Sequence, residues 1–173
     1  KQGTAQDQSD PYPTMDVLIV VRREAQDSLQ DKEISDSSIC RTTIVAGVAF
    51  EYYKRAQCGL LSYVVVPNEF RKLGVMKSLH PVACQAMQLL HEEHAATSSS
   101  SISPSIHAIL AETNTPEAGD VPPSVIRKRH ETLYRLGYRH LKFPYIQPAL
   151  GEDAKNFDEI ILLIYEPSND FTS

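Results

Sequence analysis

Tyr63-Val-Val-Val-Pro-Asn-Glu-Phe-Arg-Lys-Leu-Gly-Val-Met-Lys-Ser-Leu79 is the stretch that decides the fold. Its first residues are apolar and predict a strand that ends at Pro67, and its last residues open an amphipathic helix. A short polar turn with the basic pair Arg71 and Lys72 and with Gly74 joins the two. Because a helix N-terminus presents free N–H groups and the positive end of a dipole, this order predicts a cradle for an anion of phosphate size.

The composition predicts one ordinary domain. The chain has 173 residues, 42% of them hydrophobic, and a net charge of −5, which is enough apolar material to bury a core. No cluster of lysine and arginine predicts a nucleic-acid partner. No apolar run is long enough to span a bilayer and no signal peptide is recognisable, so we expect no membrane partner either. An acidic balance weakly favours a cationic amine as substrate.

The cysteines and histidines carry no metal or disulfide pattern. Cys40, Cys58 and Cys84 are widely spaced and form no CxxC pair, which favours a reducing, cytoplasmic location. His91 and His94 share a helix face, but they lie near a helix C-terminus, where imidazoles complement the dipole. We therefore predict no metal site.

Periodicity predicts the elements along the chain. Residues 1–14 and 168–173 are polar and are predicted to be flexible tails, which leaves a single domain at 15–167. Residues 24–42 fit neither helix nor strand and are predicted to be a long connection. The predicted strands are 15–21, 44–53, 60–66, 105–112, 138–146 and 159–166, and the predicted helices are 75–94 and 124–136. The order β-β-β-α-β-α-β-β is typical of an α/β fold with a mixed sheet, whose last two strands form a hairpin.

Several details follow from single residues. The strand 60–66 is nearly all apolar and is predicted to be central and buried on both faces. Gly47 marks a bulge or a close backbone approach. Pro81 predicts either a kink in the first helix or a helix that starts near His80. In the second helix, Ser124 is expected to cap the start. The predicted cap at its end is Gly137, in the left-handed conformation.

The motifs, taken in order, resemble a known family. Arg71-x-x-Gly74 at the mouth of the helix resembles the acyl-coenzyme A loop of the GNAT-type N-acetyltransferases. Downstream, the strand end Glu112-x-Asn114, the helix end Glu131-Thr-Leu-Tyr-Arg-Leu-Gly-Tyr-Arg-His140 and the run Phe143-Pro-Tyr-Ile-Gln-Pro-Ala-Leu150 resemble the other end of such a domain. The resemblance covers about residues 43–166 and lies in the sequence of motifs more than in any one of them.

The resemblance implies acetyl-coenzyme A, or another acyl-coenzyme A, as co-substrate. Its pyrophosphate needs convergent N–H donors without bulky side chains nearby, which the turn after Arg71 can supply. Its pantetheine amides need exposed backbone partners, which a strand that splays from its neighbour can offer. The residues expected to bind the cofactor are Val64, Val65, Val66, Arg71, Lys72, Leu73, Gly74, Val75, Met76 and Asn114.

The chain departs from the family pattern in three places. Met76 stands where the loop usually has a small residue, and it either crowds the pyrophosphate or turns into the core. Leu133 stands where the family tyrosine is usual, and Tyr134 follows it, about 100° further around the helix. A full domain begins with a strand and two helices. We expect that arm to be missing, replaced, or supplied from upstream in a longer protein, with shortened helices in 24–42 as the alternative.

The implied reaction is direct acyl transfer to an amine, with Glu112 as base and Tyr134 as acid. Glu112 is preferred over Glu51, the other carboxylate on a predicted strand, because ligands gather at the C-terminal ends of strands in α/β folds. A backbone N–H near Val66 would hold the oxyanion. Tyr134 would protonate the leaving thiolate, or else would only pack against coenzyme A or the core. The predicted protein is thus an N-acyltransferase for an unidentified amine, either a small molecule or a protein. The alternatives are a GNAT-like module that binds without catalysis and an unrelated α/β domain.

Overall fold

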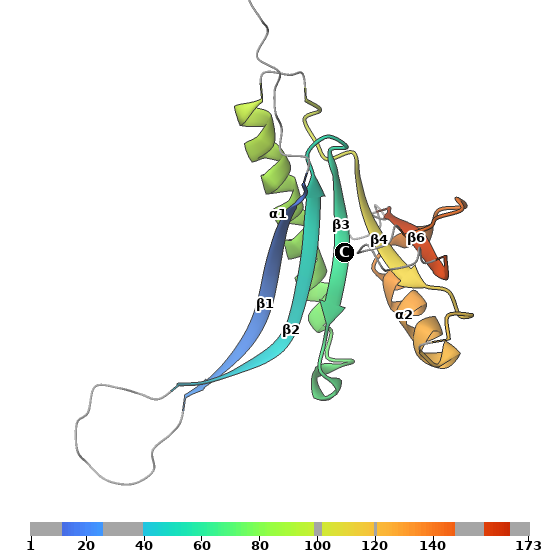
Figure 1. Ribbon diagram of the computed structural model, residues 1–173. Coiled ribbons are helices and arrows are strands. Elements are labelled where there is room, and N and C mark those ends of the chain that lie inside the picture. The colour runs from blue at the N-terminus through green and yellow to red at the C-terminus, as the bar shows by residue number, and fades with distance from the viewer. Residues whose placement is uncertain (1–11, 26–39, 99–101, 120, 148–157, 167–173) are drawn as a thin grey trace, which may run out of the picture.

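The computed structural model describes residues 12–25, 40–98, 102–119, 121–147 and 158–166. Most of the predicted tails and of the connection 24–42 lies outside these ranges. Within them, six strands form one mixed sheet in the order β1-β2-β3-β4-β6-β5, shown in Figure 1. The elements are β1 (Thr14–Ala25), β2 (Cys40–Tyr53), β3 (Cys58–Val65), the 3-10 turn η1 (Asn68–Phe70), α1 (Val75–Thr97), β4 (Ala108–Asn114), α2 (Pro123–Arg135), β5 (Tyr138–His140) and β6 (Ile160–Tyr165).

The predicted order of strands and helices is confirmed, and so is the α/β class. All neighbouring strands pair antiparallel except β3 and β4, which are parallel and joined through α1. The stretch 63–79 is strand, turn and helix, as predicted, and β5 and β6 are antiparallel neighbours. None of the helices in the described part of the chain is long and apolar enough to cross a membrane.

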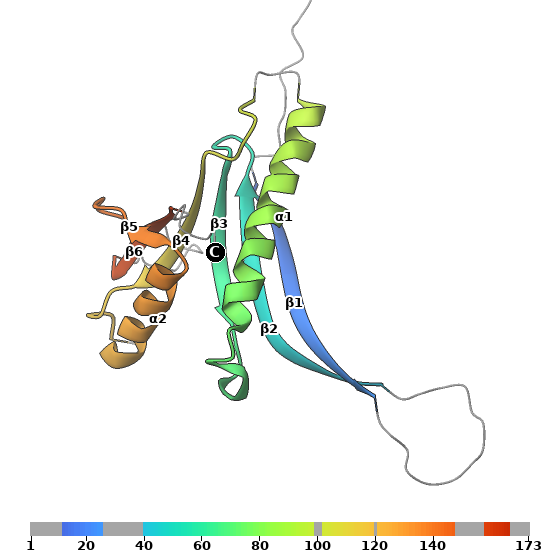
Figure 2. The same ribbon diagram turned by 180° about the vertical axis from the view of Figure 1, so that it is seen from behind.

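In the β1-β2-β3 half of the sheet, one face is covered by α1, which runs lengthwise over β2 in Figure 2. Successive side chains of a strand point to opposite faces, and β2 shows this clearly. Phe50 and Tyr52 are buried toward the helix, whereas Glu51 and Tyr53 lie on the other face. The face away from α1 is therefore the one that carries the carboxylate of β2.

The first helix runs through its proline. It begins at Val75, so the predicted start near His80 is wrong. Pro81 lies on the exposed side, where the lack of its N–H removes only the bond to the carbonyl of Lys77. The opposite side of the helix is anchored in the core by Leu79, His80, Ala83, Met87 and His91.

Three local predictions about burial and capping are decided by the structure. The strand β3 is not buried on both faces, because Tyr63, Val64 and Val65 are exposed at 67%, 42% and 62%. Ser124 does not cap α2, since Pro122 holds the N-cap position without a side-chain bond and Pro123 begins the helix. Gly137 after α2 has φ of +101°, and this confirms the left-handed end.

Candidate functional site

The strands β3 and β4 separate halfway along their length. Their parallel pairing stops at Leu61 and Ala111, although β3 continues to Val65 and β4 to Asn114. Beyond this point β3 pairs with β2, and β4 pairs with β6. Figure 1 shows the two strand ends diverging, and we call this divergence the β3–β4 fork. Half of the backbone groups at the end of β3 point away from β2, toward the fork, and have no strand partner there.

A β-bulge lies at the base of the fork. Leu61 pairs with Phe50 and Tyr63 with Ala49, so Ser62 is an extra residue in β3. Bulges bend a strand and re-aim its side chains, and the Ser62 hydroxyl here donates to Glu51 Oε1 at 2.8 Å. The bulge that was predicted at Gly47 lies two positions earlier, because the β1–β2 register shifts between Val20 and Val21 and leaves Val45 as an extra residue of β2. A Cβ on Gly47 would lie 3.6 Å from the Leu18 carbonyl oxygen, an ordinary contact, so no close approach requires glycine there either.

The turn after β3 leads to an uncapped helix N-terminus. Lys72 and Gly74 both have left-handed φ values, +65° and +78°, and Gly74 is the N-cap of α1. No side chain caps this end, and the first-turn N–H groups of Val75 and Met76 have no acceptor within the helix. Arg71 Nε donates to the Val66 carbonyl oxygen at 2.9 Å and so pins the turn to the end of β3.

The predicted cofactor residues divide by exposure. Arg71, Lys72, Leu73 and Gly74 are exposed, whereas Val66, Val75 and Met76 pack against the core. Of the two alternatives predicted for Met76, crowding the pyrophosphate or turning into the core, the structure shows the second. A Cβ on Gly74 would meet nothing within 4 Å, so there is open space in front of the turn.

Asn114, at the end of β4, is held by α2. Arg129 Nη1 donates to its Oδ1 at 3.0 Å, and His130 Nε2 donates to its carbonyl oxygen at 2.8 Å. Asn114 is therefore fixed at the tip of the β4 side of the fork.

Glu112 is the first residue of β4 beyond the paired segment. It stands between Ala111 and Thr113, which are buried, and so faces away from the helices. Tyr145 Oη donates to its Oε1, and Gln147 Nε2 donates to its Oε2 at 3.0 Å. Burial and the bond to Glu112 raise the pKa of Tyr145 well above its ordinary value, which keeps the phenol protonated.

Glu51, on the β2 side, is held in the same manner. Tyr53 Oη donates to its Oε2 at 2.6 Å, while its Oε1 accepts from Ser62. Burial raises the pKa of Tyr53, and the charges of Glu51 and of Glu112 raise it further. The charge of Glu112 thus acts on the same Tyr53 phenol that is bonded to Glu51. In the described residues, neither one forms an ion pair with lysine or arginine.

Tyr134 lies near the C-terminal end of α2. It is 42% exposed and lines a surface hollow of about 540 Å³ together with Arg135, Arg139 and His140. Leu133, which stands at the family's tyrosine position, is buried in the core instead. Among the described contacts none joins Tyr134 to Glu112, so the two predicted catalytic residues are not brought together by a bond.

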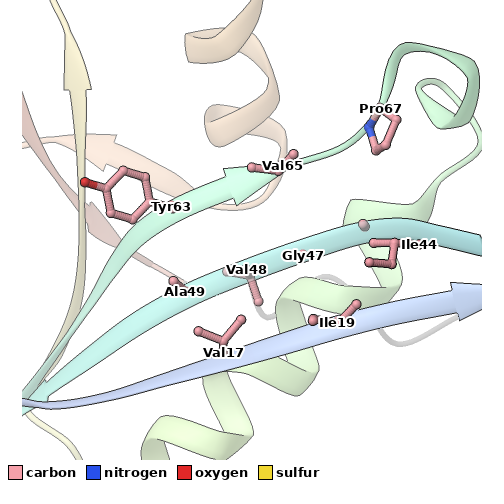
Figure 3. Close-up of a pocket in the computed structure, with 10 residues that line it drawn as sticks. Val17, Ile19, Ile44, Gly47, Val48, Ala49, Tyr63, Val65 and Pro67 are labelled. Atoms are coloured by element: carbon pink, nitrogen blue, oxygen red, sulfur yellow. The ribbon is translucent and has the colours of Figure 1, made fainter.

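An apolar groove lies on the sheet face that carries Glu51. Its volume is about 260 Å³, and Figure 3 shows side chains of β1, β2 and β3 around it. Tyr63 and Val65, from the exposed end of β3, form one wall. Glu51 follows the groove residue Ala49 by two positions on β2, which places it about 7 Å further along the same face.

The histidines of α1 serve the fold. His91 Nδ1 accepts from Tyr52 Oη at 2.9 Å, and its Nε2 donates to the Ser103 carbonyl oxygen at 2.8 Å. His94 contacts the same phenol at 3.5 Å. Since both ring nitrogens of His91 are used, this residue ties α1 to β2 and to the segment before β4. No group of three metal-type side chains occurs in the part of the chain that the structure describes.

The partners of the two carboxylates were not predicted. Glu112 was predicted from its strand position and preferred over Glu51, but Tyr53, Ser62, Tyr145 and Gln147 were not assigned to the site. The available signal was the run 143–150, whose polar Tyr145 and Gln147 are two residues apart among apolar residues and prolines.

The chain was compared with known proteins. No protein-family model and no curated protein matches it. Solved structures with a similar fold include a Bacteroides thetaiotaomicron protein described as a GNAT-family acetyltransferase (TM-score 0.48, 12% identity, 72% of this chain and 56% of that one). A Bacillus subtilis acetyltransferase in complex with CoA has a TM-score of 0.43 and 13% identity, over 72% of this chain and 70% of that one. Nourseothricin acetyltransferase has a TM-score of 0.44 and 12% identity, over 89% and 88%. These acetyltransferases are what the chain is similar to, and the activities in their descriptions are their own.

Proposed function

We propose that this protein binds an acyl-coenzyme A at the β3–β4 fork and transfers its acyl group to an amine. The observation that carries the proposal is the end of the β3–β4 pairing at Leu61 and Ala111. It leaves unpaired backbone of β3 on one side and Glu112 on the other, with the N-terminus of α1 ahead of them. A thioester ligand with two amides and a pyrophosphate is complementary to such an arrangement.

The residues present fit the expected co-substrate. The first-turn N–H groups of α1 and the left-handed turn at Lys72 and Gly74 suit a pyrophosphate. The space in front of Gly74 is open, and Met76 does not enter it. The backbone of residues 64–66 would hold the pantetheine amides in the manner of an added strand. Asn114 would contribute from the β4 side.

For catalysis, the co-substrate supplies an activated acyl group and the chain must handle protons. An amine with a pKa of about 10 is protonated at neutral pH, so a base has to remove its proton. We assign this role to Glu112, because it is the carboxylate of β4 at the base of the fork. A backbone N–H near Val66 would hold the thioester oxygen, and Tyr134 is the proposed acid for the thiolate.

Two assays test the proposal in order. Thermal unfolding is followed during titration with acetyl-coenzyme A, and saturating ligand at about 100 times its dissociation constant should stabilise the fold by about 2.7 kcal/mol. No stabilisation at millimolar ligand would remove the cofactor from the proposal. Release of the free thiol is then measured with a panel of small amines and peptides with free N-termini.

A second candidate is a module that binds acyl-coenzyme A without turnover. It is favoured by the burial of Leu133 and the exposure of Tyr134, which leave no tyrosine at the family position. Stabilisation by acetyl-coenzyme A without thiol release for any amine would select it over the enzyme.

We also propose the kind of amine that accepts the acyl group and the cellular compartment of the protein. Either a small-molecule amine or a protein amine suits a base at the fork. Cys58 and Cys84 are free thiols, which suits a reducing compartment such as the cytoplasm.

A further inference from the structure

We infer that Tyr145 is a positioning residue that holds the carboxylate of Glu112 in its working orientation, together with Gln147. The inference rests on the proposed function, since it assigns a role to residues beside the proposed base. It adds to the site a segment after β5 that lies 33 residues from Glu112 in sequence.

The contacts of the two residues point to one target. Tyr145 reaches one oxygen of Glu112 and Gln147 reaches the other. Both side chains are half-buried, and the side-chain hydrogen bonds described for them go to Glu112 alone. The backbone of their segment is tied to the sheet by a different bond, from the Leu141 N–H to the Leu162 carbonyl oxygen at 3.0 Å. The side chains of Tyr145 and Gln147 therefore restrain the Glu112 carboxylate, while a backbone bond attaches their segment to the sheet.

The two hydrogen bonds to Glu112 suit a carboxylate that acts as a base rather than one that is neutralised by a positive charge. A carboxylate has about four acceptor positions, two on each oxygen. One donor on each oxygen fixes the plane of the group and leaves acceptor positions open for the N–H of an amine or for a bridging water. Because burial and Glu112 keep the phenol of Tyr145 protonated, it remains a donor throughout the neutral pH range.

The position of the Glu112 carboxylate matters because the proposed base acts across the β3–β4 fork. Glu112 is the first residue of β4 past the last β3–β4 pair, as the bulged Ser62 is on β3. No strand partner on the fork side restrains its side chain. A displacement of about 1 Å in a reacting group can cost about 100-fold in rate, so losing one of two restraints should be visible in kcat.

The test is a double-mutant cycle of Tyr145→Phe and Glu112→Gln, measured by thiol release from acetyl-coenzyme A with an accepted amine. We expect Tyr145→Phe to lower kcat about 10- to 100-fold, with less than a twofold change in KM for acetyl-coenzyme A. In the Glu112→Gln background the same change should have no further effect, because the group it positions is gone. Gln147→Leu removes the second donor and should repeat this pattern, which keeps the test available if one variant folds poorly.

Tyr138→Phe is the matched control. It removes a phenol that also holds one partner, His80 Nε2 at 3.1 Å, but in the core. It should alter thermal stability and leave kcat within about twofold of the unmodified protein. An equal loss from Tyr145→Phe in both backgrounds would show that Tyr145 does not act through Glu112, and an unchanged kcat would overturn the inference while leaving the acyltransferase standing. Lack of thiol release by the unmodified protein with every amine would instead overturn the proposed function, and this inference with it.

Discussion

The left-handed turn at Gly74 gives a prediction that distinguishes the strain of a positive φ from a steric clash of the side chain. Gly74 has φ of +78° and a Cβ there would meet nothing within 4 Å, so Gly74→Ala introduces strain without a clash. A left-handed alanine costs about 1–2 kcal/mol. Alanine also restricts the unfolded chain, which offsets about 0.4–1 kcal/mol. The net loss of unfolding free energy should be about 1 kcal/mol, or about 2–4 °C in Tm for a chain of this size.

Gly119→Ala is the matched control, because a Cβ on Gly119 also meets nothing within 4 Å and its φ is not in the left-handed range. This variant should keep or slightly raise Tm. Thermal unfolding followed by circular dichroism compares the two. Equal melting temperatures for both alanine variants would refute the strained turn.

The same pair of variants tests the cradle. A methyl group at residue 74 projects into the open space that we assign to the pyrophosphate, so Gly74→Ala should weaken acetyl-coenzyme A binding while Gly119→Ala should not. Isothermal titration gives both dissociation constants. Unchanged affinity in Gly74→Ala would refute the placement of the pyrophosphate, whatever its effect on Tm.

Two further predictions concern the core. Gly59→Ala should destabilise the fold by about 1–3 kcal/mol through overpacking, because its Cβ would collide with the sulfur of Met87 and lie 3.3 Å from Met87 Cγ. Urea unfolding measures the loss of unfolding free energy. A loss below about 0.5 kcal/mol would mean that Met87 moves aside freely. His80 is 2% exposed, and burial lowers its pKa below the ordinary value. At a pH between that lowered pKa and about 6.5, His80 therefore binds a proton in the unfolded chain but not in the folded chain. Stability should therefore be complete above pH 6.5 and fall as the pH drops, by at most about 1.4 kcal/mol per pH unit; His80→Phe should flatten this slope in urea titrations at pH 5–7, and an identical slope in the variant would contradict the assignment.

Local patterns predicted the elements well where one face is buried and failed where tertiary contacts decide. The order of strands and helices followed from periodicity, because each element has to bury one side. The apolar run of β3 gave the wrong burial for Val64 and Val65, since its sequence does not reveal that β4 departs from it at Ala111. The alternative start of α1 near His80 was wrong, because Leu79 and Ala83 anchor a helix that begins at Val75 and this outweighs one missing hydrogen bond.

The candidate site was predicted in its local parts only. The turn at Gly74 and the strand end at Glu112 are contiguous motifs, and the structure places both at the fork. The bonds from Tyr145 and Gln147 to Glu112 join residues more than 30 positions apart. The bulge at Ser62 depends on the register between β2 and β3. Neither leaves a periodic trace in the chain, so only a three-dimensional arrangement could reveal them.

The fork also divides the sheet into two sets of three strands. In the described residues, β1-β2-β3 and β4-β6-β5 are joined within the sheet by four residue pairs, from Cys58–Ala108 to Leu61–Ala111. Amide hydrogen exchange should therefore show two groups of protected strands whose opening is only weakly coupled. A ligand that bridges the fork would fuse them into one exchange unit, so its binding would slow exchange in β6 as well as in β2, far from any atom that it touches.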